Sequence, residues 1–130
     1  MKITGDPLAF STSEQWRTWL EAHHASAEEA WVLISKKHGT APLVSLVEAT
    51  EEALCFGWID SSMRPIDADR FALRYTPRRQ ASKWSPTNRA RVERLIKEGR
   101  MTDSGLAAIE EAKRNGRWES EEIGKGRDAS

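Results

Sequence analysis

Little in this sequence identifies a chemistry by itself. The chain of 130 residues has one cysteine, Cys55, which excludes an internal disulfide and a zinc site built from cysteines. Its three histidines, His23, His24 and His38, follow no metal-ligand spacing, so we expect no metal site. The glycine-rich loops and nucleophile motifs of nucleotide-binding and hydrolytic enzymes are also missing, and the sequence implies no cofactor.

Long apolar runs are absent as well. No stretch approaches the roughly 18–20 apolar residues of a transmembrane helix, and no apolar run follows Met1–Gly5 as in a signal peptide. We therefore expect a cytoplasmic protein that does not insert into a membrane. Net charge is absent too, because 20 basic and 20 acidic residues cancel. Overall charge thus predicts neither nucleic-acid nor membrane binding.

Tryptophan is abundant, with six residues in this short chain. Because one indole can bury about 150–250 Å², a few of them can dominate the core of a small domain. The length fits one domain. We assign residues 1–118 to that domain, with Trp118 docking back onto it, and the polar residues 119–130 to a disordered C-terminal tail.

Hydrophobic periodicity and turn residues predict a helix over 11–23, a strand over 31–36, a helix over 45–56, strands over 58–63 and 71–76, and helices over 85–98 and 102–115. The order α-β-α-β-β-α-α lacks the regular alternation of a doubly wound fold. It predicts an α+β fold with a small, mainly antiparallel sheet of about three strands packed by four helices.

Side-chain caps mark the helix starts in this scheme. Ser11–Glu14 and Ser45–Glu48 fit capping boxes, while Ser85 and Thr102 are single N-caps. Helical spacing predicts a buried position for the apolar residues Trp16, Trp19, Leu20, Leu46, Ala49, Ala53, Leu54, Val92, Leu95, Ile96, Leu106, Ile109 and Ala112.

The zero net charge conceals an uneven distribution. Residues 1–63 carry four basic and nine acidic side chains, and residues 101–130 carry five basic and seven acidic ones. Residues 64–100 carry eleven basic side chains, mostly arginine, against four acidic ones. Arginine presents a planar fork of donors that suits phosphate and carboxylate groups. The middle of the chain is therefore the candidate anion-binding part.

This basic segment has two interpretations, which the sequence leaves open. Its cations can pair with the acidic N-terminal half, in surface ion pairs that each contribute little to stability. Alternatively, the stretch around the helix start at Ser85 binds an anion, which the N–H groups of a helix start attract. The ligand-binding candidates there are Arg78, Arg79, Lys83, Trp84 and Asn88.

The most distinctive run is Gly57-Trp58-Ile59-Asp60. Its carboxylate, Asp60, is either a general base or the structural partner of an arginine from residues 74–79. We favour the structural pair, since a carboxylate beside an aromatic turn is costly without a partner. Trp58 and Asp60 complete the ligand-binding candidates. We expect the neighbouring Cys55 to be a small buried hydrophobe.

Three blocks of the sequence resemble one family of bacterial proteins. They are Ala53–Asp60 (ALCFGWID), Thr76–Arg79 (TPRR) and Ser82–Asn88 (SKWSPTN). Together they are similar to the YdeI/OmpD-associated (OmdA-like, bacteriocin-protection) family, and the likeness covers about residues 8–118. One position departs from the pattern, because Ser61 stands where the family usually has glycine.

The resemblance implies little chemistry. It indicates a poorly characterised bacterial protein without established catalytic residues, and the family name suggests a link to stress or antimicrobial-peptide tolerance. A tight turn or close ligand approach at Ser61 is not carried over.

Three hypotheses of function follow. In the first, a cleft between Trp58–Asp60 and Arg78–Asn88 binds a small anionic ligand or an acidic protein without catalysis. In the second, the protein is an enzyme that acts on a small substrate through Asp60 and an arginine. In the third, the basic segment 64–100 binds nucleic acid. The neutral overall charge and the lack of a nucleic-acid-binding motif disfavour the third hypothesis without excluding it.

Overall fold

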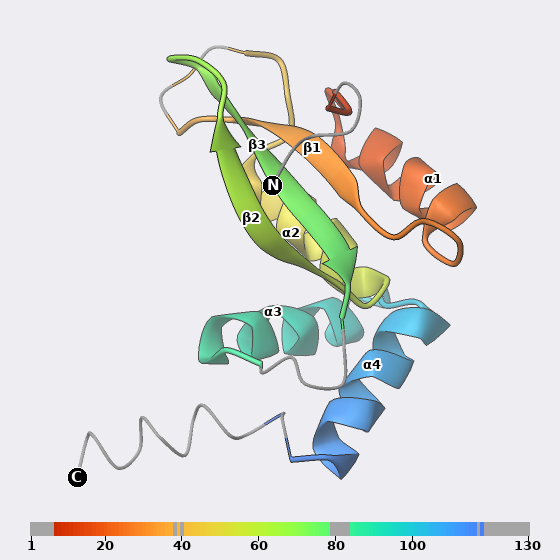
Figure 1. Ribbon diagram of the computed structural model, residues 1–130. Coiled ribbons are helices and arrows are strands. Elements are labelled where there is room, and N and C mark those ends of the chain that lie inside the picture. Colours follow the sequence, from red (N-terminus) through yellow and green to blue (C-terminus); the bar gives the residue numbers. More distant parts are fainter. Residues whose placement is uncertain (1–6, 38, 40, 79–83, 117, 119–130) are drawn as a thin grey trace, which may run out of the picture. The chain divides into compact units, whose positions relative to one another are not determined.

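The structure, a computed structural model, describes residues 7–37, 39, 41–78, 84–116 and 118. Its elements are α1 (Ser13–His23), β1 (Ala30–Ser35), α2 (Leu46–Cys55), β2 (Trp58–Pro65), β3 (Arg70–Pro77), α3 (Pro86–Lys97) and α4 (Asp103–Arg114) (Figure 1). The three strands form one sheet in the order β1-β3-β2, and both pairings are antiparallel. The predicted α+β class and element order are confirmed.

Two compact units make up the chain. The first unit contains residues 1–53 and 58–77, and so includes the whole sheet, α1 and most of α2. The second unit contains residues 54–57 and 78–130, with α3 and α4. The assignment of residues 1–118 to a single domain stays a prediction beside this division, and the predicted tail over 119–130 lies outside the described residues.

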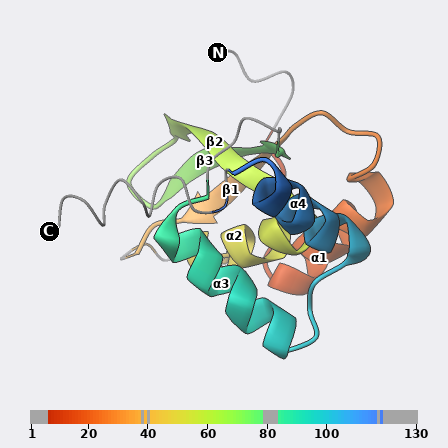
Figure 2. The same ribbon diagram turned by 90° about the horizontal axis from the view of Figure 1, so that it is seen from below.

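The core of the first unit is an aromatic cluster where α1 and α2 cover one face of the sheet (Figures 1 and 2). Trp16 of α1 is fully buried, with its ring centroid 5.5 Å from that of Tyr75 on β3. Its Nε1–H donates to the carbonyl oxygen of Ala49 on α2 at 2.9 Å. The Tyr75 hydroxyl lies 3.0 Å from Thr50 Oγ1. Both rings thus have polar partners inside the core, as buried polar groups require.

A smaller apolar cluster lies on the opposite face of the sheet. Because side chains alternate along a strand, Trp31 and Leu33 of β1 point away from α1 and α2. They pack with Ala72 of β3 and Leu43. Five of the six β1 residues are buried, so this strand is covered on both faces. The Trp31 Nε1–H is buried without a hydrogen-bond partner among the described residues.

Side-chain caps begin the last three helices as predicted. Ser45 Oγ accepts from the Glu48 N–H at 3.1 Å, and Glu48 Oε1 accepts from the Ser45 N–H at 3.0 Å, which completes the capping box of α2. Ser85 caps α3 and Thr102 caps α4. Gly57 has φ 79° just beyond α2, a conformation that glycine adopts without strain.

Two predictions about the helices are wrong. Thr12 rather than Ser11 caps α1, because the sequence from Thr12 to Gln15 also fits a capping box and Thr12 accepts from the Gln15 N–H. Three positions predicted to be buried are exposed, namely Leu46 (44%), Ile96 (46%) and Leu106 (40%). The buried stripe of α4 runs through Gly105 and Ile109, which leaves Leu106 on its flank.

The second unit is organised around the end of α2. The Cys55 carbonyl oxygen accepts from both the Thr102 N–H, at 3.0 Å, and Thr102 Oγ1, at 2.6 Å. Gly105 in the first half of α4 approaches the same carbonyl so closely that a β-carbon there would lie 2.3 Å from the oxygen. Cys55 itself is buried and has a free thiol, as predicted. The N-terminal end of α4 therefore packs directly on the backbone of residues 54–57.

Candidate functional site

The sequence-predicted site residues are divided between the two units. Trp58 and Asp60 lie on β2 in the first unit. Trp58 is 1% exposed and meets the Trp19 ring edge-on, with the centroids 6.1 Å apart. It is a core residue, so it can act on a ligand only by supporting its neighbours. Asp60 is exposed.

The structural ion pair predicted for Asp60 does not form with Arg74. Arg74 Nε instead binds Glu29 Oε1 at 2.6 Å. Asp60 makes no ion pair within the described part of the chain, and its exposed position explains why it needs none. The register of β2 against β3 shifts between Asp60 and Ser62, so Ser61 is the extra residue of a β-bulge. Among the described residues, only glycines have positive φ, so Ser61 does not. The bulge therefore does not require glycine at this position.

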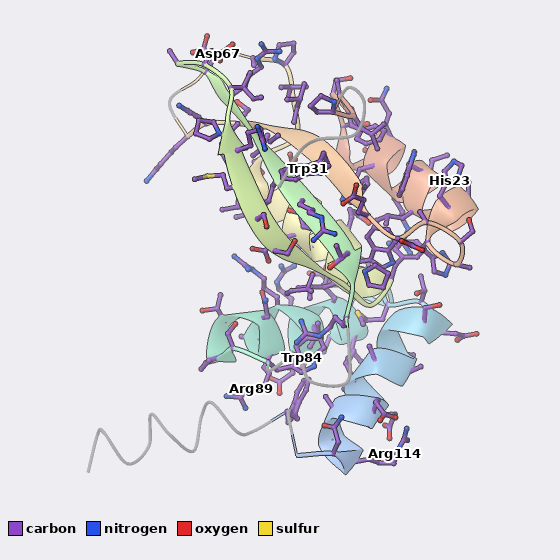
Figure 3. The ribbon with its side chains drawn as sticks, viewed as in Figure 1. His23, Trp31, Asp67, Trp84, Arg89 and Arg114 are labelled. Atoms are coloured by element: carbon purple, nitrogen blue, oxygen red, sulfur yellow. The ribbon has the colours of Figure 1, made fainter. Side chains whose placement is uncertain are left out.

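The second unit gathers cations around two indole rings. The Arg78 guanidinium carbon lies 3.9 Å from the centroid of Trp84, whose ring centroid is 5.2 Å from that of Trp118. Arg89 of α3 lies 5.9 Å from the Trp118 ring, and the Lys113 ammonium of α4 lies 5.2 Å from it. Trp84 directly precedes the Ser85 cap of α3, and Arg89 lies on this helix (Figure 3). We call these five residues the cation–indole cluster.

Three of the predicted residues sit in or near this cluster. Arg78 is half-buried, and Trp84 is 1% exposed, so this indole can influence a ligand only by positioning Arg78. Asn88 lies in the first turn of α3, where its backbone N–H donates to Ser85 Oγ at 3.1 Å and its Oδ1 accepts from Arg91 Nη1 at 2.8 Å. The other two candidates in this stretch, Arg79 and Lys83, lie outside the described residues.

Much of the remaining basic segment is used in internal ion pairs. Arg70 binds Asp67 at 2.8 Å in the turn between β2 and β3, and Arg94 binds Glu98 at 3.0 Å. Arg100 also binds Glu98, at 3.4 Å. The Arg70 side chain and the Asp69 backbone N–H hold the pKa of Asp67 below its ordinary value. The hydrogen bond from Arg94 likewise lowers the pKa of Glu98. Internal pairing therefore applies to these arginines and to Arg74.

A cavity of about 550 Å³ opens in the first unit, and its lining includes none of the residues that the sequence nominated. It is lined by Ser35, Lys36, Lys37, Ser45, Leu46, Val47 and Phe71. We call it the Lys36–Phe71 groove. Its lining residues include two lysines and no acidic residue, and the surface that they present to the cavity is almost entirely apolar. Leu46 and Val47, in the first turn of α2, are 44% and 49% exposed beside it.

The sequence indicated neither the groove nor three of the five cluster residues, Arg89, Lys113 and Trp118. The adjacent Lys36 and Lys37 after a buried strand, followed by the apolar pair Leu46 and Val47 directly behind a helix cap, are the signals that point to the groove. No local pattern could indicate that Arg89 lies near Trp118, because this contact depends on how separate segments of the second unit meet.

The described residues contain no group of three or more histidine, cysteine, aspartate or glutamate side chains that could hold a metal ion. Among them, no helix has the length and apolar character needed to cross a membrane.

The α+β fold, the cation–indole cluster and the Lys36–Phe71 groove describe the chain structurally. A comparison with known families shows which family it belongs to. Residues 8–108 match a family described as a domain of unknown function (DUF8412), and the chain belongs to this family. No curated protein and no solved structure matches the chain. The match spans all three sequence blocks that resemble the YdeI/OmpD-associated family. It does not address that resemblance, which stays a prediction.

Proposed function

We propose that this protein is a non-enzymatic binding protein for a small anionic ligand or an acidic partner, and that the cation–indole cluster is its binding surface. The observation that carries the proposal is the position of the Arg78 guanidinium, 3.9 Å from the ring of the buried Trp84. A guanidinium held against a fixed aromatic face loses less side-chain entropy when it binds an anion than a mobile one does.

The rest of the cluster supplies further positive charge. Arg89 and Lys113 approach the neighbouring Trp118 ring from α3 and α4. Three cations gathered within one unit favour a ligand with more than one negative charge, such as a phosphate-bearing molecule or a row of carboxylates. Arg79 and Lys83 neighbour Arg78 and Trp84 in the sequence, and their role in binding stays a prediction from the sequence.

The remaining sequence-predicted residues have secondary roles in the proposal. Asn88, whose side chain accepts from Arg91, orients that arginine at the start of α3. The participation of Trp58 and Asp60, predicted from the sequence, is a separate hypothesis. A contribution to stress or antimicrobial-peptide tolerance is proposed from the family resemblance alone.

Affinity for pyrophosphate and for a glutamate-rich peptide tests the proposal. We expect amide NMR shifts in the second unit, and we expect Lys113→Gln to weaken pyrophosphate binding by about threefold to tenfold, as the loss of one cation implies. Arg114→Gln is the matched control, because Arg114 is the next residue of α4, is exposed and pairs with Glu111. Equal losses in the two variants, or no binding of either probe, would contradict the proposal.

The two alternative functions have separate tests. If the protein is an enzyme that uses Asp60, Asp60→Asn keeps its stability and ligand binding but loses turnover. If the protein binds nucleic acid through residues 64–100, the affinity for a short DNA or RNA falls steeply with salt, because phosphate contacts release counterions. Neither alternative has a described contact that favours it over anion binding.

A further inference from the structure

We propose that the Lys36–Phe71 groove binds a small amphipathic carboxylate, meaning a molecule with one acid group on an apolar body. The groove belongs to the first unit and shares no residue with the cation–indole cluster. The inference therefore does not rest on the function proposed above, and it adds a second ligand site to the protein.

The size and lining of the groove match a small-molecule site. Its volume of about 550 Å³ lies within the range of roughly 300–1,000 Å³ that is usual for ligand pockets. Phe71 of β3 and the exposed aliphatic side chains of Leu46 and Val47 provide apolar walls. Neighbouring apolar side chains that are about half exposed cost free energy in water, and an apolar ligand body would cover them.

The charges at the edge of the groove select the second part of the ligand. Because the lining is almost entirely apolar, Lys36 and Lys37 line it with their aliphatic stems and keep their ammonium groups at its edge. Lys36 and Lys37 are exposed residues of the lining, and neither forms an ion pair with another described residue. The other polar residues of the lining are two serines, Ser35 and Ser45. The Ser45 hydroxyl already accepts the Glu48 N–H in the helix cap. So few donors suit the two oxygens of a carboxylate better than a phosphate group, which needs more hydrogen bonds.

The backbone that carries the lysines is fixed by its neighbours. The Lys36 N–H donates to the Asp69 carbonyl oxygen at 2.8 Å, and the Ser35 N–H donates to the Val44 carbonyl oxygen at 3.0 Å. A β-carbon on Gly39 would lie 2.6 Å from the Asp69 oxygen, so the chain after Lys37 runs directly against the turn between β2 and β3. The backbone positions of the two lysines are therefore set before any ligand arrives, which lowers the entropic cost of binding.

Two acidic side chains near the groove, those of Glu48 and Asp67, already have partners. The Glu48 carboxylate accepts the Ser45 N–H in the cap of α2. Asp67, at the tip of the β2–β3 hairpin (Figure 3), binds Arg70. Asp69 contacts Lys36 through the backbone, because its carbonyl oxygen accepts the Lys36 N–H at 2.8 Å. The lysines are thus the charges of the groove that a ligand carboxylate would meet.

Titration with decanoate, and with decanol as the neutral control, tests the inference by amide NMR on the full chain. We expect decanoate to shift the amides of Lys36, Lys37, Leu46, Val47 and Phe71. We expect decanol, which has the same apolar body without the charge, to bind at least about tenfold more weakly, because it loses the charge-assisted contacts. Equal binding of the two probes would overturn the assignment of the lysines.

The variant Val47→Glu, compared with Val47→Gln, tests the charge of the site in the protein. Val47 is 49% exposed in the first turn of α2, where an acidic side chain is compatible with the helix. Both variants should therefore fold, which the thermal midpoint checks. We expect Val47→Glu to weaken decanoate binding about tenfold relative to Val47→Gln, because it adds a like charge.

A double variant, Lys36→Gln with Lys37→Gln, is expected to bring the affinity for decanoate down to that for decanol. Lys97→Gln in α3 removes one charge from the second unit and should leave decanoate binding unchanged. If the Lys97 variant loses decanoate binding, or if decanoate shifts only the amides of the cation–indole cluster, the groove is not the site. Absence of any decanoate shift also overturns the inference. It would leave the proposed anion binding by the cation–indole cluster unaffected, because pyrophosphate tests that proposal.

Discussion

The two units use tryptophan in different ways. In the first unit, Trp16 is a core residue whose ring packs on Tyr75 and whose N–H is bound to the Ala49 carbonyl. In the second unit, Trp84 and Trp118 pack on each other and have cations against their rings, with Arg78 3.9 Å from one centroid and Lys113 5.2 Å from the other. Tryptophan thus fills the core of the first unit, whereas in the second unit its rings also contact cationic side chains.

This difference separates stability from binding. Changes to the buried indoles of the first unit should act on folding, because the protein already covers their ring surfaces. Changes to the cations of the second unit should act mainly on ligands, since a cation beside an aromatic ring contributes only about 0.5–2 kcal/mol to stability. The predictions below test this division.

The largest effect is expected from Trp16→Ala. Removing a fully buried indole together with its 2.9 Å hydrogen bond to Ala49 should lower the free energy of unfolding by about 3–5 kcal/mol. Chemical denaturation measures this change. Trp19→Ala is the control on the same helix, because Trp19 is only half-buried. An equal loss in the two variants would contradict the role of Trp16 as the centre of the core.

The next effect is expected from Gly105→Ala in the second unit. Alanine favours a helix over glycine by about 1 kcal/mol, so propensity alone predicts a more stable protein. The new β-carbon, however, would lie 2.3 Å from the Cys55 carbonyl oxygen, and the shift of α4 that relieves this clash should cost about 1–3 kcal/mol. A rise in the thermal midpoint of this variant would show that α4 does not approach α2 so closely.

A smaller effect is expected from Arg78→Met. Methionine keeps much of the apolar stem but removes the charge from the Trp84 ring, which should lower stability by about 1 kcal/mol. Arg78→Lys, which keeps the charge, should lose less. Denaturation followed by tryptophan fluorescence measures both variants. A loss comparable to that of Trp16→Ala would mean that Arg78 is a core residue rather than a ligand-binding one.

The smallest effect concerns pH. The Arg70 side chain and the Asp69 N–H lower the pKa of Asp67. The ionised Asp67 carboxylate therefore stabilises the hairpin at pH values above 3.8, the ordinary pKa of this group. This contribution is lost as the pH falls below 3.8 through the pKa of the folded state. Carboxyl NMR should give a midpoint for Asp67 below 3.8, and Arg70→Ala should raise it. A midpoint at or above 3.8 in the unmodified protein would contradict this account.

The fold was largely predictable from local signals. The Ser45–Glu48 capping box, the glycine at residue 57 and the alternation along β3 are short-range patterns, and they gave the correct element order. Errors arose where burial depends on tertiary neighbours. Leu46 and Leu106 fit the apolar spacing, but neither lies on the side of its helix that the fold covers.

The candidate site was only partly predictable. The sequence shows the high density of arginine in residues 64–100, and it nominates both Arg78 and Trp84, which lie against each other in the structure. Composition could not show which arginines are used in ion pairs, because Arg74 finds its partner, Glu29, far away in the sequence. The Lys36–Phe71 groove joins residues from three separate segments, so its formation depends on tertiary structure.

The most direct test of anion binding by the second unit is an amide NMR map of the protein recorded with pyrophosphate. The account predicts shifts concentrated on Arg78, Trp84, Arg89, Lys113 and Trp118, which weaken in Lys113→Gln and persist in Arg114→Gln. Shifts spread evenly over exposed lysines and arginines, or a map unchanged by pyrophosphate, would contradict the claim that the cation–indole cluster is a binding surface.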